Sequence, residues 1–130
     1  MSDIRHQMTD ERKRQMGYKD LKVYEKSYKS ALSIYRMTEV FPKEEMYGMT
    51  SQIRRAATSI PLNIAEGYAK RESQMEFKRY LMMALGSSDE MQVLLDFAKD
   101  LGYTEPETYE KAKATYKEIS RMLNKMVKSV

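Results

Sequence analysis

The sequence lacks the residues on which most catalytic and metal sites depend. Its 130 residues include no cysteine and one histidine, His6, which lies in a polar N-terminal segment. The absence of cysteine excludes disulfides, thiolate nucleophiles and zinc–sulfur sites. Because the body of the chain has no histidine, we expect neither a Ser–His–Asp triad nor a multi-histidine metal site there.

Other enzyme signatures are missing as well. The carboxylates Glu66, Glu76, Asp89 and Glu90 suggest a di-metal helical bundle, but such a site also needs Glu-x-x-His pairs, which the sequence does not have. It has no glycine-rich loop of the kind that cradles a phosphate. We therefore expect a protein that is not an enzyme, with no catalytic residue, no metal and no cofactor.

Long apolar runs are also absent. No stretch reaches the roughly 18 apolar residues of a transmembrane helix, and residues 1–17 are too polar for a secretory signal. We expect a cytoplasmic protein that does not contact a membrane. The length suits one domain, which we place at residues 18–130 behind a flexible, charged lead at 1–17.

Four segments show the apolar periodicity of amphipathic helices, at about residues 20–40, 50–68, 74–101 and 105–130. The expected core positions are Leu21, Tyr24, Tyr28, Ala31, Tyr35 and Thr38, with Leu32 and Ile34 widening this stripe; Met49, Ile53, Ala56, Ile60, Ile64 and Gly67 or Tyr68; Phe77, Leu81, Ala84, Ser88, Met91, Leu95 and Ala98; and Tyr109, Ala112, Tyr116, Ile119, Leu123, Met126 and Val130. No segment alternates like a strand. Short connections between the helices predict an all-α, antiparallel up-down four-helix bundle.

Local signals mark the ends of these helices. Ser73-Gln-Met-Glu76 and Thr104-Glu-Pro-Glu107 are two capping boxes, in which the first and fourth side chains satisfy each other's backbone N–H groups. Gly102 supplies the left-handed stop of the third helix. They predict where the third and fourth helices begin and where the third ends.

Pro61 lies inside the second apolar pattern. A proline removes one helical hydrogen bond, here to the carbonyl of Ala57, and bends the helix. The apolar spacing nevertheless continues through it. We therefore predict one kinked helix rather than two, with Ser59 or Asn63 helping to satisfy the freed carbonyl groups.

A polar ridge runs beside the apolar stripe of this helix. It contains Gln52, Arg55, Ser59, Asn63 and Glu66. Small residues around Gly67 and Gly86 would allow a close helix approach. We hypothesise that these two regions meet, or face a second subunit, with Asn63, Glu66, Ser87 and Glu90 in a polar network. The alternative is an ordinary solvated helix surface.

Some apolar residues exceed what one small core needs. Met82, Leu85 and Val93 lie off the main stripe of the third helix, and Met122 and Val127 lie off that of the fourth. This surplus favours self-association. A wide core stripe with scattered exposed apolar residues is the alternative.

Positive charge is concentrated at the C-terminal end. Residues 111–130 contain six Lys or Arg and one acidic residue. Residues 1–110 contain 17 Lys or Arg and 18 acidic residues. Lys113, Lys117, Arg121, Lys125 and Lys128 form one ridge that is suited to phosphate contacts. Further candidate donors are Arg54, Arg55, Lys70, Arg71, Lys78 and Arg79. A solubilising helix face is the competing interpretation.

Tyrosines supply a second kind of nucleic-acid contact. Tyr47, Tyr68 and Tyr103 are candidates for stacking on bases, or they are core or interface residues.

The pattern SQ-x-RRA-x-x-SI-x-x-NIAEG, matched at residues 51–67, resembles the bacterial four-helix bundle family whose members occur in intervening sequences of large-subunit ribosomal RNA genes. The resemblance extends over about residues 21–103. It implies an antiparallel bundle that assembles as a ring-like homopentamer. It also points to a related branch, the accessory variability proteins of diversity-generating retroelements, which are basic, pentameric and bind nucleic acid and a reverse transcriptase. The intact NIAEG is more similar to the ribosomal branch.

Two hypotheses for function follow. The first is a non-enzymatic oligomer that binds RNA or DNA, alone or in a ribonucleoprotein, through its basic surfaces. The second is a protein-interaction scaffold, including an accessory subunit of a reverse transcriptase. The surplus apolar faces favour the second, and the basic ridge favours the first.

Overall fold

The computed structural model describes residues 17–130, and within that range every regular element is helical. The four long helices are α2 (Lys22–Thr38), α3 (Met49–Ala69), α4 (Gln74–Asp100) and α5 (Pro106–Ser129). Two short 3-10 helices, η1 (Tyr18–Asp20) and η2 (Lys43–Glu45), precede α2 and α3. Residues 1–16 of the expected charged lead lie outside the described residues.

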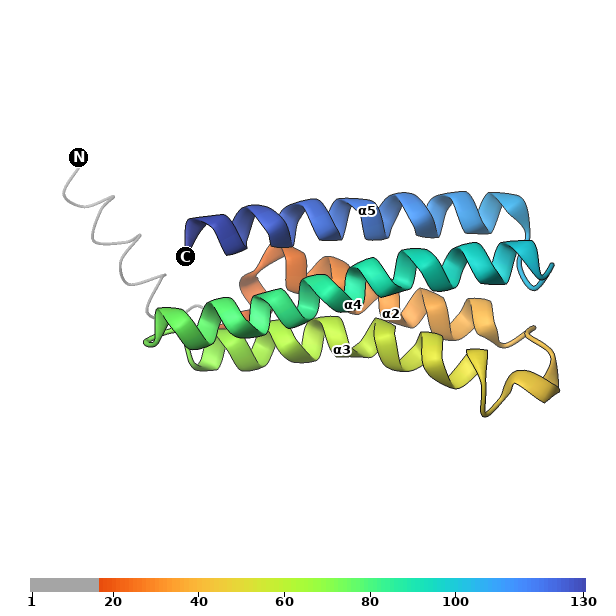
Figure 1. Cartoon of the computed structure of the whole chain (residues 1–130), viewed down its shortest axis with the longest axis horizontal. Coiled ribbons are helices and arrows are strands. Elements are labelled where there is room, and N and C mark those ends of the chain that lie inside the picture. The colour runs from red at the N-terminus through yellow and green to blue at the C-terminus, as the bar shows by residue number, and fades with distance from the viewer. Residues whose placement is uncertain (1–16) are drawn as a thin grey trace.

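The four long helices run antiparallel along the long axis of the molecule (Figure 1). Each helix reverses the direction of the one before, so the α2–α3 and α4–α5 connections lie at one end and the α3–α4 turn lies at the other. Close packing follows chain order, while α2 and α5 contact each other least. The predicted antiparallel up-down bundle is therefore confirmed, and its loosest seam lies between α2 and α5.

The core forms along the predicted stripes of α3, α4 and α5. Its fully buried members include Ile53, Ile60 and Ile64 from α3, Leu81, Met91 and Leu95 from α4, and Tyr116, Ile119 and Leu123 from α5. These positions recur every three or four residues, so each helix turns one side inward. Burying this apolar surface supplies the main driving force for folding.

The predicted stripe of α2 is confirmed at Ala31, Ile34 and Thr38. It is wrong at Tyr28, Leu32 and Tyr35, where in each case the preceding residue is buried instead. The side chains that face the core are Val23, Ser27, Ala31, Ile34 and Thr38. Tyr28, Leu32 and Tyr35 are exposed instead. The small Ser27 and the branched Val23 and Ile34 fit the closely packed interior, whereas the tyrosines place their hydroxyl groups at the surface.

Helix α3 continues through Pro61, so the prediction of one helix is confirmed, and the kink stays a prediction. The Ser59 hydroxyl donates to the carbonyl of Ala56, and the Asn63 amide donates to the carbonyl of Ser59, both at 2.8 Å. These bonds do not reach the carbonyl of Ala57, which the proline deprives of its donor. The prediction that Ser59 or Asn63 satisfies the freed carbonyl is therefore wrong, because both side chains donate to carbonyl groups that the proline does not free.

The helix ends follow the capping signals in part. The Ser73 hydroxyl accepts a hydrogen bond from the backbone N–H of Glu76, as predicted, but the Glu76 carboxylate pairs with Arg79. Helix α5 begins one residue later than its predicted cap, because Glu105 rather than Thr104 is the N-cap and its side chain makes no capping bond. Gly102 has a φ of 76°, which confirms it as the left-handed stop of α4.

Candidate nucleic-acid interface

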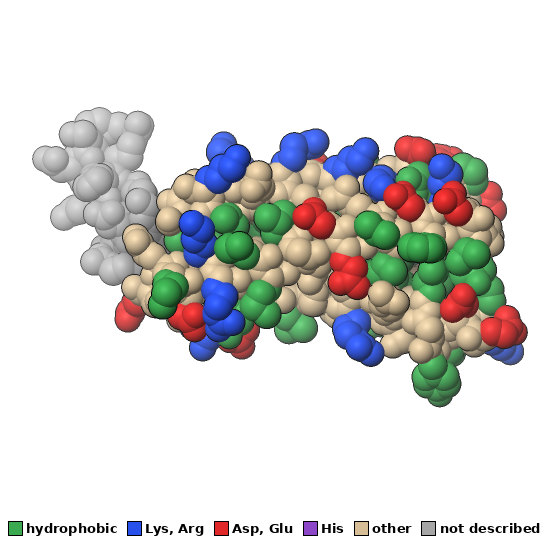
Figure 2. All heavy atoms as spheres, in the orientation of Figure 1, with side chains coloured by type: hydrophobic (Ala, Val, Ile, Leu, Met, Phe, Trp, Pro, Cys, Tyr) green, Lys and Arg blue, Asp and Glu red, His purple; other side chains and the backbone are tan. Residues whose placement is uncertain are grey.

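Four exposed cations form a ridge on α5. Lys117, Arg121, Lys125 and Lys128 are exposed, and none of them pairs with a carboxylate elsewhere in residues 17–130. At 1.5 Å and 100° per residue, they span about 17 Å of the helix within an arc of about 80°, opposite the core stripe. Figure 2 shows Lys and Arg side chains in a row along the edge of the molecule formed by α5. We name these four residues the α5 ridge.

Lys113 was predicted as part of this ridge, but its charge is already engaged. Its ammonium group donates to the Asp96 carboxylate at 2.6 Å, and the Tyr109 hydroxyl donates to the same oxygen at 2.6 Å. The hydrogen bonds from Lys113 and Tyr109 lower the pKa of the Asp96 carboxyl below its ordinary value. Lys113 therefore joins α5 to α4 and is less available to a phosphate than the ridge.

Most of the other predicted cations also have partners inside the molecule. Arg54 donates to the Thr38 hydroxyl at 2.7 Å and covers the ring of Tyr35. Arg79 pairs with Glu76 at 2.8 Å. Arg71 donates to the Tyr68 carbonyl at 2.9 Å and covers that ring.

Lys70, Lys78 and Arg55 are the less constrained members of this set. Lys70 lies 4.0 Å from Glu66, while Lys78 and Arg55 are exposed on α4 and α3. Arg55 donates to the Ser51 hydroxyl at 3.5 Å, the outer limit of a hydrogen bond. It lies about 100° around α3 from Arg54. Arg54 contacts α2 and Arg55 lines a groove against α4, so the RR pair of the motif faces two different surfaces.

The polar ridge of α3 borders a groove against α4. This groove, of about 580 Å³, is lined by Tyr47, Gln52, Arg55, Ser59, Ser87 and Glu90, among others. We name it the α3–α4 groove. Gln52, Arg55 and Ser59 of the predicted polar ridge therefore line one groove with Ser87 and Glu90 of α4. The sequence had instead suggested Asn63 and Glu66 as the partners of these two α4 residues.

The expected meeting of Gly67 and Gly86 within the chain is wrong, and a contact of these regions with a second subunit stays a prediction. Gly67 is buried against α4 at Phe77 and Tyr80, where a Cβ atom would lie 2.9 Å from Tyr80 Cβ. Gly86 is exposed, and a Cβ atom there would meet nothing within 4 Å. The antiparallel register explains the difference, because the C-terminal end of α3 lies beside the N-terminal end of α4.

The expected polar network is absent among the described residues. Asn63 bonds to its own helix, Glu66 lies near Lys70, and no hydrogen bond links either of them to Ser87 or Glu90. A network that the sequence did not reveal instead joins α4 to α5. The Ser120 hydroxyl lies 2.8 Å from both the Ser88 hydroxyl and the Asp89 carboxylate and donates its one hydrogen to either of them, while Gln92 donates to Ser120. In the sequence, the one sign of this α4–α5 network is the polar residue Ser88 within an otherwise apolar stripe.

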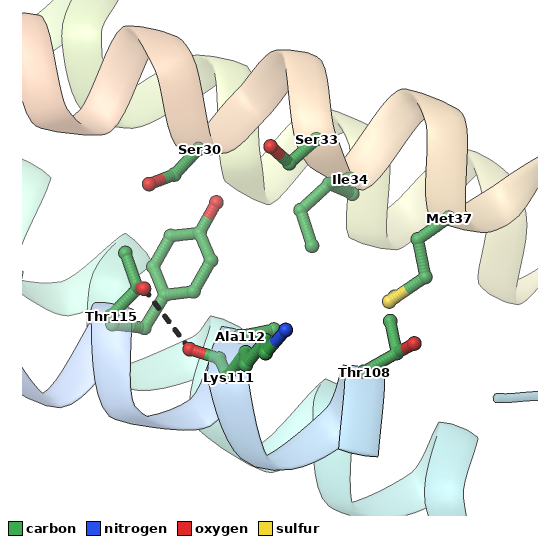
Figure 3. Close-up of a pocket in the computed structure, with 9 residues that line it drawn as sticks. Ser30, Ser33, Ile34, Met37, Thr108, Lys111, Ala112 and Thr115 are labelled. Carbon is green, nitrogen blue, oxygen red and sulfur yellow. Dashed lines mark hydrogen bonds between the residues drawn. The ribbon is translucent and has the colours of Figure 1, made fainter. Parts of the chain in front are cut away.

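A second concave site lies in the loose seam between α2 and α5 (Figure 3). Ser30, Ser33 and Met37 of α2 face Thr108, Ala112 and Thr115 of α5 across about 260 Å³. Tyr116 also lines it, and its buried hydroxyl has no partner among the described residues. Burial raises the pKa of that phenol. The lining contains hydroxyl groups, the Met37 thioether and Lys111.

An apolar groove that the sequence did not predict lies between α2 and α3. It is lined by Tyr24, Tyr28, Leu32, Tyr35, Pro61 and Leu62, among others. Leu62 is 65% exposed and Tyr28 49% exposed. We name this the tyrosine groove. The sequence pattern predicted that these tyrosines lie in the core. The surplus of apolar residues was the one sign in the sequence that some apolar side chains lie outside the core.

Residues 17–130 also lack a metal-binding cluster and a membrane-spanning helix. No group of three His, Cys, Asp or Glu side chains in this range is arranged to hold a metal ion. None of its helices is long and apolar enough to cross a membrane.

The fold and its surfaces define a small helical bundle with a basic helix face and two surface grooves, in which the SQ-x-RRA motif lines one groove. The chain belongs to the family of 23S rRNA-intervening sequence proteins, whose family model matches residues 19–125. The resemblance predicted from the sequence is therefore confirmed.

A solved structure supports the same assignment. The chain is similar to a protein of unknown function from the S23 ribosomal protein family of Bacteroides thetaiotaomicron, with 29% sequence identity and a TM-score of 0.74. The similarity covers 82% of this chain and 95% of that chain. No protein with a curated description matches this chain.

Proposed function

We propose that this protein binds RNA in the cytoplasm through the α5 ridge and catalyses no reaction. The observation that carries the proposal is the set of four exposed cations on one side of α5 without carboxylate partners among the described residues. Lys and Arg rows of this kind neutralise phosphates and release counterions. The membership in a family named for 23S rRNA intervening sequences favours RNA over DNA as the first ligand to test.

The local electrostatics also favour this surface. Lys128 lies in the last turn of α5, where the negative end of the helix dipole stabilises its charge. The acid closest in sequence, Glu118, pairs with Lys26 of α2 at 3.1 Å. Tyr109 and Tyr116, the aromatic residues of α5, are buried, so the ridge offers phosphate contacts without base stacking. We therefore expect it to bind duplex and single-stranded RNA with little preference for sequence.

Salt-dependent binding tests the proposal. Fluorescence anisotropy of a labelled RNA duplex is measured across a salt series for the wild type and for a variant with Lys117→Gln, Arg121→Gln and Lys125→Gln. Each lost phosphate contact reduces the salt slope by about 0.9, so the slope is expected to fall by about 2 to 3.

A matched variant controls for net charge. Lys22→Gln, Lys29→Gln and Lys43→Gln remove the same charge from exposed positions of α2 and η2, outside the α5 ridge. We expect this variant to bind nearly as the wild type does. Equal weakening by both variants would show that binding depends on net charge rather than on the ridge, and no binding by the wild type at low salt would end the proposal.

A scaffold function is the second candidate, and the tyrosine groove is the observation that favours it. Exposed apolar surface of this kind is typical of protein–protein contacts. We propose that the protein assembles with itself, as the pentamer that the family resemblance implies, and a reverse transcriptase is an alternative partner. The genes adjacent to the coding sequence would distinguish a retroelement from a ribosomal RNA operon.

A further inference from the structure

The α3–α4 groove holds polar side chains that the fold itself does not use. The side chains of Gln52 and Glu90 form no hydrogen bond or ion pair with other described residues, and the Arg55 guanidinium has only its 3.5 Å contact with Ser51. Arg55 and Glu90 line the same groove but do not pair with each other. Three hydrogen-bonding groups of different character therefore remain free for a ligand. The volume lies within the range of about 300 to 1,000 Å³ that is usual for small-molecule sites.

An aromatic side chain stands at the edge of this groove. Tyr47 is 97% exposed, which is unusual for a tyrosine because its ring is largely apolar. The chain that carries it is held at its base, since Glu45 accepts hydrogen bonds from the Tyr103 hydroxyl at 2.7 Å and from the Met49 N–H at 3.1 Å. The ring is thus presented beside the groove by a fixed turn.

The chemistry of these four side chains fits a nucleotide. An exposed aromatic ring stacks on a base, and a guanidinium binds a phosphate. Glutamine and glutamate recognise base edges, and glutamate accepts from exocyclic amino groups such as those of adenine and cytosine. With one cation and one carboxylate, the groove suits a single base better than a run of phosphates.

We propose that the α3–α4 groove binds one unpaired, amino-bearing base of an RNA. Tyr47 stacks on the base, Gln52 and Glu90 bind its edge, and Arg55 contacts its phosphate. This inference rests on the proposed RNA binding and adds a preference for unpaired adenine or cytosine that the α5 ridge alone does not provide. It also gives the SQ-x-RRA motif a role, because Gln52 and Arg55 belong to it.

The test compares three labelled RNAs by fluorescence anisotropy: ten adenines, ten uracils and a duplex. Loss of one base stack costs about 1–3 kcal/mol, so Tyr47→Ala is expected to weaken binding of the adenine strand about fivefold to more than a hundredfold. Duplex binding should change by less than about twofold. Tyr47→Phe keeps the ring and serves as the matched control, and Glu90→Gln should reduce the preference for adenine over uracil.

The outcomes separate this inference from the proposed function. In one outcome, duplex binding depends on salt and on the α5 ridge, but Tyr47→Ala leaves adenine-strand binding unchanged. This result would overturn the proposed base site in the groove and support RNA binding by the ridge. In the other outcome, adenine-strand binding depends on Tyr47 but not on the ridge, which would support the base site and overturn the ridge. If Tyr47→Ala changes the molecular mass measured by light scattering, the groove is a contact between subunits and the nucleotide site is wrong.

Discussion

At the scale of single residues, two glycines of similar sequence context occupy opposite environments. Gly67 lies in α3 where the backbone of α4 approaches, and Phe77 and Tyr80 fill the space that a side chain would need. Gly86 lies in the middle of α4 with open space around it. The first glycine therefore permits close packing, while the second only weakens its helix within the single chain.

We expect opposite effects when alanine replaces these glycines. Gly67→Ala forces the new methyl group against Tyr80 and should lower the free energy of unfolding by about 1–3 kcal/mol, as overpacked positions do. Gly86→Ala adds helix propensity without a clash and should raise it by about 0.5–1 kcal/mol. Urea unfolding at a fixed protein concentration measures both, and a loss of stability in both variants would contradict the assignment of Gly86 to open space.

At the scale of elements, α4 and α5 are joined by polar contacts as well as by the core. Asp96 accepts hydrogen bonds from Lys113 and Tyr109 near one end of the pair, and the Ser88–Ser120 network lies near the middle. The two contacts fix the register of α5 against α4 and so hold the α5 ridge on the outer side. The α2–α5 seam has only the Lys26–Glu118 ion pair.

The Asp96 contact predicts a dependence of stability on pH. Hydrogen bonds from Lys113 and Tyr109 lower the pKa of Asp96 from its ordinary value of 3.8. A carboxyl whose pKa is lower in the folded state stabilises the fold above its ordinary pKa, and that contribution is lost as the pH falls through the folded value. Asp96→Asn should therefore be less stable than the wild type at pH 7, by at most about 1 kcal/mol, because the Asp96 side chain is 47% exposed and solvent screens its charge.

The difference between wild type and Asp96→Asn should shrink as the pH falls below about 4. Thermal unfolding followed by circular dichroism between pH 7 and pH 3 measures it. Asp100→Asn is the control, because Asp100 is exposed and makes no ion pair with another described residue. A difference for Asp96→Asn that is the same at every pH would show that the carboxylate charge does not matter.

At the scale of the whole molecule, different surfaces suit different partners. The α5 ridge is basic, the α3–α4 groove is mixed in character, and the tyrosine groove is apolar. Two unlike surfaces in contact between neighbouring copies generate a ring when the rotation closes. We propose the tyrosine groove as one half of such a contact because it exposes the most continuous apolar lining of the three.

A charge placed in the tyrosine groove tests the assembly. We expect native mass spectrometry of the wild type to give the mass of five copies. Leu32→Glu should shift the population toward smaller species, because a carboxylate that is buried and unpaired in the contact raises the free energy of the assembly. Ala114→Glu adds the same charge at an exposed position of α5 and should leave the mass unchanged. A monomeric wild type would contradict the proposed ring, and an unchanged Leu32→Glu assembly would exclude this groove as the contact.

The sequence by itself determined the number of helices, the core stripes of α3, α4 and α5, the stop at Gly102 and the family. These features depend on local periodicity, helix capping and a specific motif, which neighbouring residues specify on their own. The sequence also indicated the α5 ridge, because four-residue steps place side chains on one face of a helix whatever packs behind it.

Only the tertiary structure decided which faces meet. It turned Tyr28 and Tyr35 outward, paired Lys113 with Asp96, separated Gly67 from Gly86 and placed Gln52 and Arg55 opposite Glu90. Each of these outcomes depends on the rotation and register of one helix against another. A shift of one residue rotates a helix face by about 100°, and periodicity alone does not distinguish such neighbouring faces when both are apolar.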